Sequence, residues 1–288
     1  MNEPSHHFTP LGDLTLHYVA AGAGAPVVLL HGFPEFWYSW RRQLIALATA
    51  GLRAIAPDLP GYNESDKPQP VKRYRVRALV ADLAQFIGNV AGGPAVVVGH
   101  DWGGLLAWRL AATHPELVKK LAILNAPHPA AYRETLRRDP LQWFRSAYVF
   151  FFQLPVLPEA LIRAGDFALL ARAWRGQPVR PGAFTEDDIV RYKQALRPPG
   201  ALTAPLNYYR AALRFARDIY GPPQTIDVPT LVIWGQRDPY LGVRLLDDLP
   251  RWVPDLRIER IPDASHWVQN DVPERVNRLL IDFVNQRA

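Results

Sequence analysis

The sequence predicts an α/β protein in which helices flank a mostly parallel β-sheet. Short β-rich runs alternate with segments of helical periodicity over residues 1–128, and the alternation resumes after residue 223. Strands that alternate with helices are joined by right-handed crossovers, which bury a parallel sheet between two layers of helices. The chain has 288 residues, of which 49% are hydrophobic, so it contains enough apolar material for such a core.

Local periodicity indicates the individual elements. Residues 95–98 read Ala-Val-Val-Val, a short apolar run typical of a strand that is buried on both faces. Residues 75–90 instead place Val76, Leu79 and Leu83 at helical spacing. By the same reasoning we expect strands at 15–21, 26–30, 52–57, 95–98, 121–124, 230–234 and 256–261, and helices at 40–50, 75–90, 105–113 and 273–286.

A helical block interrupts this alternation. From residue 129 to about residue 222 the sequence is aromatic and punctuated by proline, and no run in it has the pattern of a buried strand. We therefore expect one core built from residues 1–128 and 223–288, with residues 129–222 inserted as a helical cap. A helical block between two halves of one sheet is the layout of a lid over an active site.

The composition excludes several kinds of chemistry. The chain has no cysteine, which rules out disulfides, thiolate zinc sites, iron–sulfur clusters and a cysteine nucleophile. It also has no metal-ligand cluster, phosphate loop or dinucleotide fingerprint. We therefore expect no metal and no cofactor, and water is the only co-substrate implied.

Charge and hydropathy restrict the partners. The net charge of +6 falls within residues 129–222, where scattered arginines are more typical of solvated helix faces than of a nucleic-acid site. The N-terminus is polar, and no apolar run approaches the roughly 20 residues that cross a bilayer. We expect a cytoplasmic protein without nucleic-acid or membrane partners, and the sequence leaves a homodimer open.

The sharpest local signal surrounds Asp101. A buried strand runs into a helix through the residues GHDWGG at 99–104. Glycines two residues before and two residues after the central position relieve the crowding of such a turn. This is the G-x-nucleophile-x-G pattern of a nucleophile elbow, with Asp101 in the place of a serine. We expect Asp101 to be exposed at a helix N-terminus, where the helix dipole favours its ionised form. The alternative is an ordinary helix-capping aspartate.

Two further residues complete the order nucleophile, acid, base. Asp238 follows the strand predicted at 230–234, and His266 follows the strand at 256–261. The carboxyl ends of parallel strands lie at the edge of the sheet where such folds place their sites. Separately, Asp238 could be a turn former and His266 a surface residue, but together with Asp101 they match the chain order of a catalytic triad.

A turn after the first parallel strand contributes a fourth part. Residues 31–35 read HGFPE, and the backbone N–H groups of Phe33 and Trp102 are expected to converge as an oxyanion hole. The side chain of His31 is expected to be a hydrogen-bonded part of the turn. Glu35 is either a residue that orients a water molecule or a surface turn residue.

These motifs resemble those of a known family. HGFPE at 31–35, GHDWGG at 99–104, WGQRD at 234–238 and SHW at 265–267 resemble the epoxide hydrolases of the α/β-hydrolase superfamily. The resemblance spans essentially all of the chain and implies the α/β-hydrolase fold with a cap. The haloalkane dehalogenases are the nearest relatives, because they share the aspartate nucleophile and often the tryptophan after it.

A carboxylate nucleophile narrows the reaction. Attack of Asp101 on an ester would give an anhydride, whereas attack on a saturated carbon with a leaving group gives an ordinary ester. An epoxide or an alkyl halide is therefore the expected electrophile. His266, oriented by Asp238, would then activate the water that hydrolyses the ester on Asp101. We predict conversion of epoxides to vicinal diols.

The resemblance also implies a pair of tyrosines that activate the epoxide oxygen. In epoxide hydrolases these lie in the cap, one in a Tyr-x-x-x-x-Gln context and one in an Asn-aromatic-Tyr-Arg context. YVFFFQ at 148–153 and NYYR at 207–210 match both, which places the pair at Tyr148 and Tyr209. The adjacent Tyr208 is the residue most easily confused with Tyr209.

Aromatic residues predict an apolar pocket for a small hydrophobic epoxide. The expected lining residues are Phe33, Trp37, Trp102, Phe151 and Trp267. A haloalkane dehalogenase is the alternative, with the indole of Trp102 and that of Trp143 or Trp174 binding the halide. A non-catalytic ligand-binding member of the fold is the third interpretation.

Overall fold

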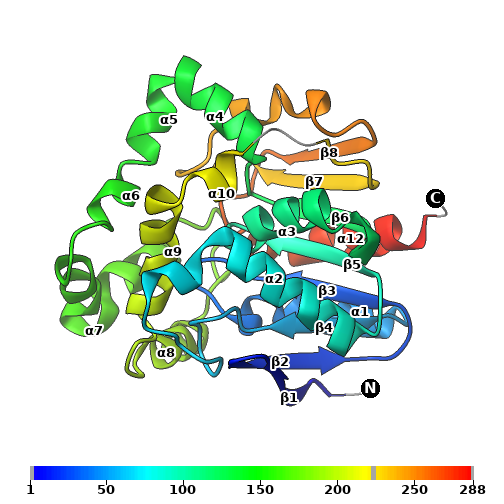
Figure 1. Ribbon diagram of the computed structural model, residues 1–288, viewed down its shortest axis with the longest axis horizontal. Coiled ribbons are helices and arrows are strands. Elements are labelled where there is room, and N and C mark those ends of the chain that lie inside the picture. Colours follow the sequence, from blue (N-terminus) through cyan, green and yellow to red (C-terminus); the bar gives the residue numbers. More distant parts are fainter. Residues whose placement is uncertain (1–2, 222–224, 287–288) are drawn as a thin grey trace.

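An eight-stranded sheet forms the centre of the molecule. The computed structural model describes residues 3–221 and 225–286. Within them the strand order is β1-β2-β4-β3-β5-β6-β7-β8. Strand β2 is antiparallel to its neighbours β1 and β4, and all other pairs are parallel (Figure 1). The strands are β1 (Ser5–Leu11), β2 (Leu14–Ala21), β3 (Pro26–Leu30), β4 (Arg53–Pro57), β5 (Ala95–His100), β6 (Val118–Leu124), β7 (Thr230–Gly235) and β8 (Leu256–Ile261).

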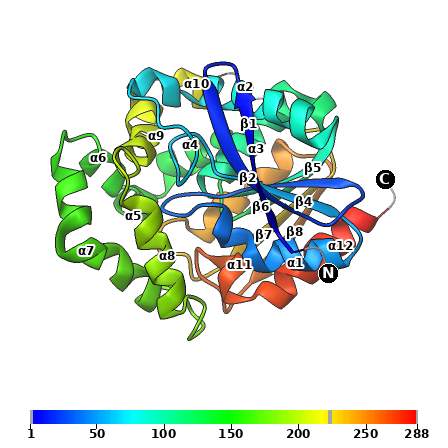
Figure 2. The same cartoon turned by 90° about the horizontal axis from the view of Figure 1, so that it is seen from below.

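The sheet is covered on both faces. Alternate residues of β3 enter two separate apolar clusters, with Val28 and Leu30 in one and Val27 and Leu29 in the other. Helices α2 (Val76–Phe86) and α3 (Trp102–Thr113) pack together on the first face. Helices α1 (Arg41–Thr49) and α12 (Pro273–Asn285) pack together on the opposite face, which Figure 2 shows below the strands. The expected α/β class is confirmed.

Short elements join these layers. They are the 3-10 turns η1 (Trp37–Trp40), η2 (Val71–Tyr74), η4 (Pro115–Leu117), η5 (Val243–Leu246) and η6 (Leu249–Arg251), the π-helical turn η3 (Ile87–Ala91) and the helix α11 (Val268–Asp271). The π-helical turn replaces the end of the helix that was expected to reach residue 90. Helix α3 begins at Trp102 rather than at residue 105, because the glycines that disfavour a helix interior are required here by the preceding turn.

Strand β1 is missing from the sequence-based prediction. It pairs with β2 along its whole length, from Ser5 opposite Ala20 to Leu11 opposite Leu14. Most of its residues are exposed, so its sequence lacks the buried alternation by which strands are recognised. Its place in the fold comes from edge pairing rather than from burial.

In the part of the chain that the structure describes, seven helices lie between β6 and β7. They gather on one side of the sheet, where Figure 1 shows α5, α6, α7 and α8 at the left. They are α4 (Pro129–Arg138), α5 (Pro140–Arg145), α6 (Tyr148–Phe151), α7 (Leu157–Gly176), α8 (Glu186–Leu196), α9 (Thr203–Arg214) and α10 (Arg217–Tyr220). Helix α7 is broken by non-helical backbone at residues 164–167. The boundary expected between residues 222 and 223 lies outside the described residues.

Membrane-spanning helices and metal-ligand clusters are both absent from the described residues. None of the helices there is both long and apolar enough to cross a membrane. No group of three or more histidine, aspartate or glutamate side chains in residues 3–221 and 225–286 is arranged to hold a metal ion.

Candidate active site

Asp101 lies in the sharp turn between β5 and α3. Its backbone has φ 49° and ψ −118°, a region that residues with side chains rarely adopt. Glycines make the turn feasible, because a side chain on Gly103 would collide with the backbone of Leu30 and His31, and one on Gly99 with the backbone of Gly103. The turn therefore presents the Asp101 carboxylate at the carboxyl end of β5.

The carboxylate of Asp101 is more buried than the sequence suggests. Its side chain is only 15% exposed, so the expectation of an exposed carboxylate is wrong. Burial raises the pKa of Asp101, while the positive charge of His266 and the backbone N–H groups of Trp102 and Phe33 act in the opposite direction. The Phe33 N–H lies 3.5 Å from Oδ1. The neighbouring groups, rather than solvent, therefore favour the ionised form.

Asp238 and His266 lie beside Asp101 at the ends of β7 and β8. Nδ1 of His266 is 2.7 Å from Oδ2 of Asp238. The other carboxylate oxygen of Asp238 accepts the backbone N–H groups of Tyr240 at 2.7 Å and Leu241 at 2.9 Å. Nε2 of His266 is 4.0 Å from Oδ2 of Asp101, which is longer than a hydrogen bond. The three residues thus meet in one place, and Nε2 is not tied to the Asp101 carboxylate.

The imidazole of His266 is strongly affected by its neighbours. Burial lowers the pKa of this group, but the charge and hydrogen bond of Asp238 and the charges of Asp101 and Glu35 outweigh it. Together they raise the pKa from 6.5 to about 9. In the free protein at neutral pH, His266 is therefore an imidazolium that faces Asp101.

Asn125 is a functional residue that the sequence did not reveal. It follows β6, is fully buried, and has a positive φ of 38°. Its Nδ2 donates to Oδ2 of Asp238 at 2.7 Å, and its Oδ1 accepts the Gly235 N–H at 2.8 Å. Asn125 thereby fixes the acid to the ends of two strands. The only sequence signal is an asparagine at a strand end, a residue type that tolerates left-handed backbone.

Glu35 lies inside the protein behind the triad. It is 2% exposed, so the interpretation as a surface turn residue is wrong. Its Oε1 accepts the Ser39 hydroxyl at 2.7 Å, and its Oε2 is 3.0 Å from Nδ1 of His100. Burial raises the pKa of Glu35, but the hydrogen bond and charge of His100 outweigh it and the pKa is lowered. An ionised Glu35 adds to the negative charge around His266.

His31 is part of the turn, as expected. It is fully buried. Its Nε2 accepts the Leu59 N–H at 3.0 Å, and its Nδ1 lies 3.0 Å from the carbonyl oxygen of Gly32. Both ring nitrogens are thus engaged in holding the backbone that precedes Phe33.

A cavity of about 290 Å³ opens above the triad. Its lining combines Asp101 and His266 with side chains of the helices between β6 and β7. These are Tyr132, Arg133, Leu136, Trp143, Ser146, Tyr148, Val149, Phe150, Tyr209, Ala212, Leu213, Ile219 and Tyr220, joined by Trp102, Leu105, Pro127, Pro129, Tyr240 and Leu241 from or near the sheet. Most of this surface is apolar, which suits a hydrophobic ligand.

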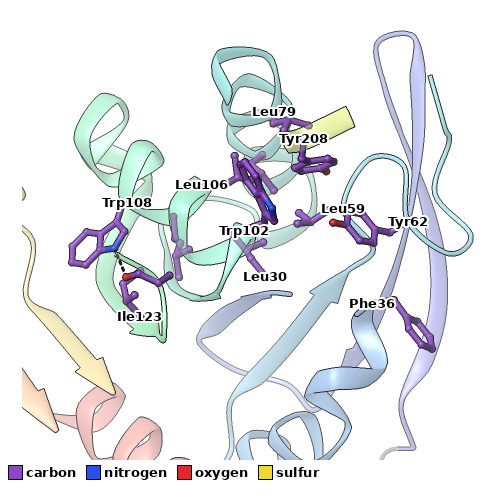
Figure 3. Close-up of a cluster of buried hydrophobic side chains, with 14 of the residues drawn as sticks. Leu30, Phe36, Leu59, Tyr62, Leu79, Trp102, Leu106, Trp108, Ile123 and Tyr208 are labelled. Carbon is purple, nitrogen blue, oxygen red and sulfur yellow. Dashed lines mark hydrogen bonds between the residues drawn. The ribbon is translucent and has the colours of Figure 1, made fainter. Parts of the chain in front are cut away.

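Tyr148 and Tyr209 line the same cavity from α6 and α9. Their rings pack edge to face with centroids 5.8 Å apart. Burial, with a smaller effect of the Asp101 charge, raises the pKa of each phenol well above its usual value, so both keep their protons. Tyr208 points elsewhere: its hydroxyl donates to the Pro60 carbonyl at 2.8 Å, and its ring packs in the core beside Trp102 (Figure 3).

Residues flanking the two tyrosines bind α6 to α9. Gln153 donates to the carbonyl oxygen of Tyr209 at 3.1 Å. The buried guanidinium of Arg210 donates to the carbonyl oxygens of Phe152 at 3.0 Å and Leu154 at 2.9 Å. The glutamine and arginine of the two sequence patterns thus hold the tyrosines at a fixed separation.

The expected pocket residues fall into two groups. Trp102 lines the cavity, and the Phe33 ring packs edge to face on Tyr209 at 5.6 Å. Phe33, Trp37, Phe151 and Trp267 are not among the lining residues, so for these four the prediction is wrong.

Their neighbours explain where these side chains point. The Trp37 ring packs against His6 of the unpredicted strand β1, at 5.2 Å. Trp267 is 2% exposed and packs against His266 and Phe184. Phe151 is half-buried and packs against Phe152. Their apolar character was visible in the sequence, but the direction of each side chain was not.

The candidate halide donors are differently engaged. The indole N–H of Trp143 donates to the Leu136 carbonyl at 2.7 Å. Trp174 is buried against Tyr192 and does not line the cavity. Neither presents a free indole N–H beside Trp102.

Comparison with known proteins is consistent with this site. Residues 25–273 match a family model described as alpha/beta hydrolase fold. The AB hydrolase superfamily protein YfhM of Bacillus subtilis is 42% identical over 282 residues, which cover 97% of this chain and 98% of that protein. Epoxide hydrolase 4 of Mus musculus is 36% identical over 303 residues, which cover 100% of this chain and 82% of that protein. An epoxide hydrolase of Bacillus megaterium, solved with an inhibitor, aligns with a TM-score of 0.89 at 29% identity, covering 97% of this chain and 100% of that one.

Replacing Asn125 by alanine tests its role in holding Asp238. We expect a loss of roughly 2–4 kcal/mol in unfolding free energy, because two buried partners lose hydrogen bonds and the backbone becomes strained. We also expect slower turnover. Urea denaturation and steady-state kinetics measure the two effects. Asn63→Ala is the matched control, since Asn63 also has positive φ and donates to a different aspartate, Asp58. Equal turnover of both variants would contradict the role.

The raised pKa of His266 predicts a dependence of stability on pH. The folded state holds this proton up to about pH 9 and the unfolded state only to 6.5. The contribution to stability is therefore complete below 6.5 and lost as the pH rises through 9. Between about pH 6 and pH 10 the free energy of unfolding of the parent protein should fall by roughly 2–3 kcal/mol more than that of His266→Gln, as measured by urea denaturation. An equal fall in the free energy of unfolding of the parent protein and of His266→Gln would contradict the raised pKa of His266.

Proposed function

Because the chain belongs to the epoxide hydrolases of the α/β-hydrolase superfamily, we propose that it converts apolar epoxides to vicinal diols through an ester on Asp101. One observation carries the proposal: Tyr148 and Tyr209, both protonated, line the same cavity as Asp101 and His266. An epoxide, unlike a halide, needs a proton donor for its departing oxygen. Two phenols beside a carboxylate nucleophile meet that need.

In the first step Asp101 attacks a ring carbon of the epoxide. Its Oδ1 accepts the Phe33 N–H, which leaves Oδ2 as the attacking oxygen. The bond from Oδ2 to carbon forms as the carbon–oxygen bond of the ring breaks. One of the two tyrosines gives its proton to the released oxygen, and the other donates a hydrogen bond to it. The products of this step are a hydroxyalkyl ester of Asp101 and a tyrosinate, which is reprotonated by the His266 imidazolium.

In the second step water hydrolyses that ester. His266 takes a proton from the water, whose oxygen attacks the carbonyl carbon of Asp101. The oxyanion that forms is stabilised by the N–H groups of Phe33 and Trp102. Collapse of the intermediate releases the diol, whose oxygen receives a proton from His266, and leaves Asp101 as a carboxylic acid. Asp101 then gives its proton to His266, which restores the carboxylate and the imidazolium.

Alkylation of Asp101 prepares His266 for this second step. The Asp101 charge is one of the groups that raise the pKa of His266 to about 9. An ester carries no charge, so this contribution disappears once the nucleophile is alkylated. The pKa of His266 then falls, and the imidazole becomes able to accept a proton from water.

The helices between β6 and β7 act as the cap in this proposal. Residues 129–222 supply both tyrosines and most of the apolar lining, and they separate the reacting atoms from solvent. Water, an apolar epoxide and the diol are the only small molecules that the mechanism requires.

Haloalkane dehalogenation is the weaker alternative. A halide leaving group needs a pair of N–H donors, and Trp102 can supply one. The indole of Trp143 already donates to a carbonyl, and Trp174 lies outside the cavity. The two tyrosines have no assigned task in that reaction. Release of halide from short haloalkanes at a higher rate than diol formation would reverse this ranking.

Trapping the ester tests the assignment of Asp101. In His266→Gln the first step stays possible and the second is blocked, because no base activates water. Incubation with a terminal aryl epoxide should add the mass of the epoxide to the Asp101 peptide, while turnover falls by about 10³-fold or more. Asp101→Asn is the control and should show neither adduct nor turnover. An adduct on another residue would refute the mechanism.

The roles of the two tyrosines are tested by kinetics of the first step. Tyr148→Phe and Tyr209→Phe should each slow ester formation about 10-fold or more, and the double variant should slow it by roughly 10²–10⁴. Stopped-flow fluorescence follows alkylation separately from hydrolysis. Tyr18→Phe, which changes a tyrosine on β2 that does not line the cavity, is the matched control. Slower hydrolysis with unchanged alkylation would contradict the proposed roles.

A further inference from the structure

A small hollow lies at the junction between the sheet region and the helices between β6 and β7. It measures about 10 Å³, roughly the space of one water molecule. Its walls come from α3, from the start of α4 and from the end of α10. Helices α4 and α10 are the first and last of the described helices between β6 and β7, and they pack against each other (Figure 1). The hollow therefore lies near both ends of this helical segment.

The hollow is rich in hydrogen-bond donors. Arg109 on α3 and Arg133 on α4 both line it, and a guanidinium carries five N–H donors at every accessible pH. The Nε of Arg133 is buried without a partner, and another of its nitrogens reaches the Tyr220 carbonyl only at 3.4 Å. Ala130, in the first turn of α4, also lines the hollow, and the N–H groups of a first helical turn have no acceptor within the helix.

His128 adds an imidazole to the same lining. It is 5% exposed, and its Nδ1 has no partner. Burial, with a smaller effect of the Arg109 charge, lowers the pKa of His128 to about 4, so the ring is neutral at pH 7. A neutral imidazole can carry its proton on Nδ1, which makes this atom a further donor.

No acidic side chain balances the two arginines. The lining of the hollow contains no aspartate or glutamate among the described residues. Glu134 on α4 is in an ion pair with an arginine of its own helix, and Asp218 on α10 accepts two hydrogen bonds of 2.9 Å from Arg75. Within residues 3–221 and 225–286 no carboxylate lies within 4.0 Å of either arginine of the hollow. A charge beside apolar groups is costly unless an acceptor compensates it.

The size and the chemistry of the hollow restrict its ligand. A water molecule must donate hydrogen bonds as well as accept them, whereas the side chains here offer donors. Phosphate, sulfate and carboxylate groups consist of several heavy atoms, so they exceed the space. A monatomic anion only accepts hydrogen bonds, and the N-terminus of a helix favours negative charge.

We propose that the hollow binds one chloride ion and that this ion joins the helices between β6 and β7 to the sheet region. The chloride would lie between Arg109 and Arg133, with Nδ1 of His128 and the first turn of α4 as further donors. Because the two arginines belong to α3 and α4, an ion that both bind resists separation of these helices. The reacting atoms of the proposed function take no part in this site.

Stability in two salts tests the binding. The urea midpoint is measured in rising sodium chloride and in sodium gluconate of equal ionic strength, because gluconate is too large for the hollow. The midpoint of the parent protein should show a rise in chloride that levels off as the site fills. In Arg109→Gln and Arg133→Gln the chloride concentration that gives half of this rise should increase about 10-fold or more, whereas gluconate should act equally on all three proteins. A parent protein that responds to chloride no more than the variants do would overturn the proposal.

Arg137→Gln is the matched control for charge. Arg137 lies on the same helix as Arg133, but it is exposed and does not line the hollow. Its removal should leave the response to chloride as it is in the parent protein. A loss as large as that of Arg133→Gln would mean a general effect of positive charge, and the site would be refuted.

Anomalous diffraction locates the ion without any variant. Bromide accepts the same hydrogen bonds as chloride, so crystals of the parent protein grown in bromide should give an anomalous peak between Arg109 and Arg133. Electron density in the hollow without an anomalous signal would identify a water molecule and overturn the proposal.

Hydrogen exchange tests the link between the two parts of the fold. At a chloride concentration of about ten times its Kd, the amides of α4 and α10 should exchange roughly 10-fold more slowly than in gluconate. Those of α12, on the opposite face of the sheet, should not change. Unchanged exchange in α4, or equal slowing in α12, would contradict the joining role.

Discussion

The backbone of Asp101 is the constraint on which the rest of the site depends. A residue with a side chain at this φ costs on the order of 1–3 kcal/mol, which the surrounding fold must supply. The fold supplies it by packing β3, β5 and α3 so closely that Gly99 and Gly103 have no room for a side chain. Gly32 in turn would strike the Asp101 side chain if it carried a Cβ. The same close approach brings the Phe33 N–H to the carboxylate, so the backbone strain and the proposed oxyanion hole have one cause.

Burial and charge oppose each other in the catalytic cluster. Burial raises the pKa of Asp101 and lowers that of His266, so it favours the neutral form of both groups, which does not suit the proposed first step. The negative charges of Asp238 and Glu35 favour the imidazolium, and the imidazolium favours the Asp101 carboxylate. Charges placed behind His266 therefore favour the ionised form of Asp101, although they do not touch it. This gives the buried Glu35 an electrostatic role that its place in a predicted turn does not suggest.

The sequence predicted features with local or topological causes. The strand at 256–261 has the expected bounds, and the triad could be located because parallel strands end at a common edge. Other features arise only from packing between distant segments. Strand β1 is polar and is held by pairing, and Asn125 is recognisable only once Asp238 lies beside it. From the sequence Trp37 is as good a pocket candidate as Trp102, but in the fold its ring packs against His6 of β1.

The two halves of the site are built by different parts of the chain. The proposed nucleophile, acid and base are fixed by the sheet, whereas Tyr148 belongs to a helix of four residues that is too short to be stable alone. The position of Tyr148 depends on hydrogen bonds from Gln153 and Arg210. These bonds fix Tyr148 relative to Tyr209 but not relative to Asp101.

The relation of the tyrosines to Asp101 depends instead on contacts between α9 and the sheet region. Tyr208, the residue before Tyr209, donates its hydroxyl to the Pro60 carbonyl. Arg75 donates two hydrogen bonds of 2.9 Å to Asp218 on α10. Tyr208 takes no part in the proposed chemistry, but its hydrogen bond to the Pro60 carbonyl helps to position the adjacent Tyr209. A buried hydroxyl with a single backbone acceptor allows little sliding, so α9 cannot shift along the sheet without breaking this bond. The distance between the attacking and the proton-donating groups is thus determined by packing beneath the cavity rather than by residues that line it.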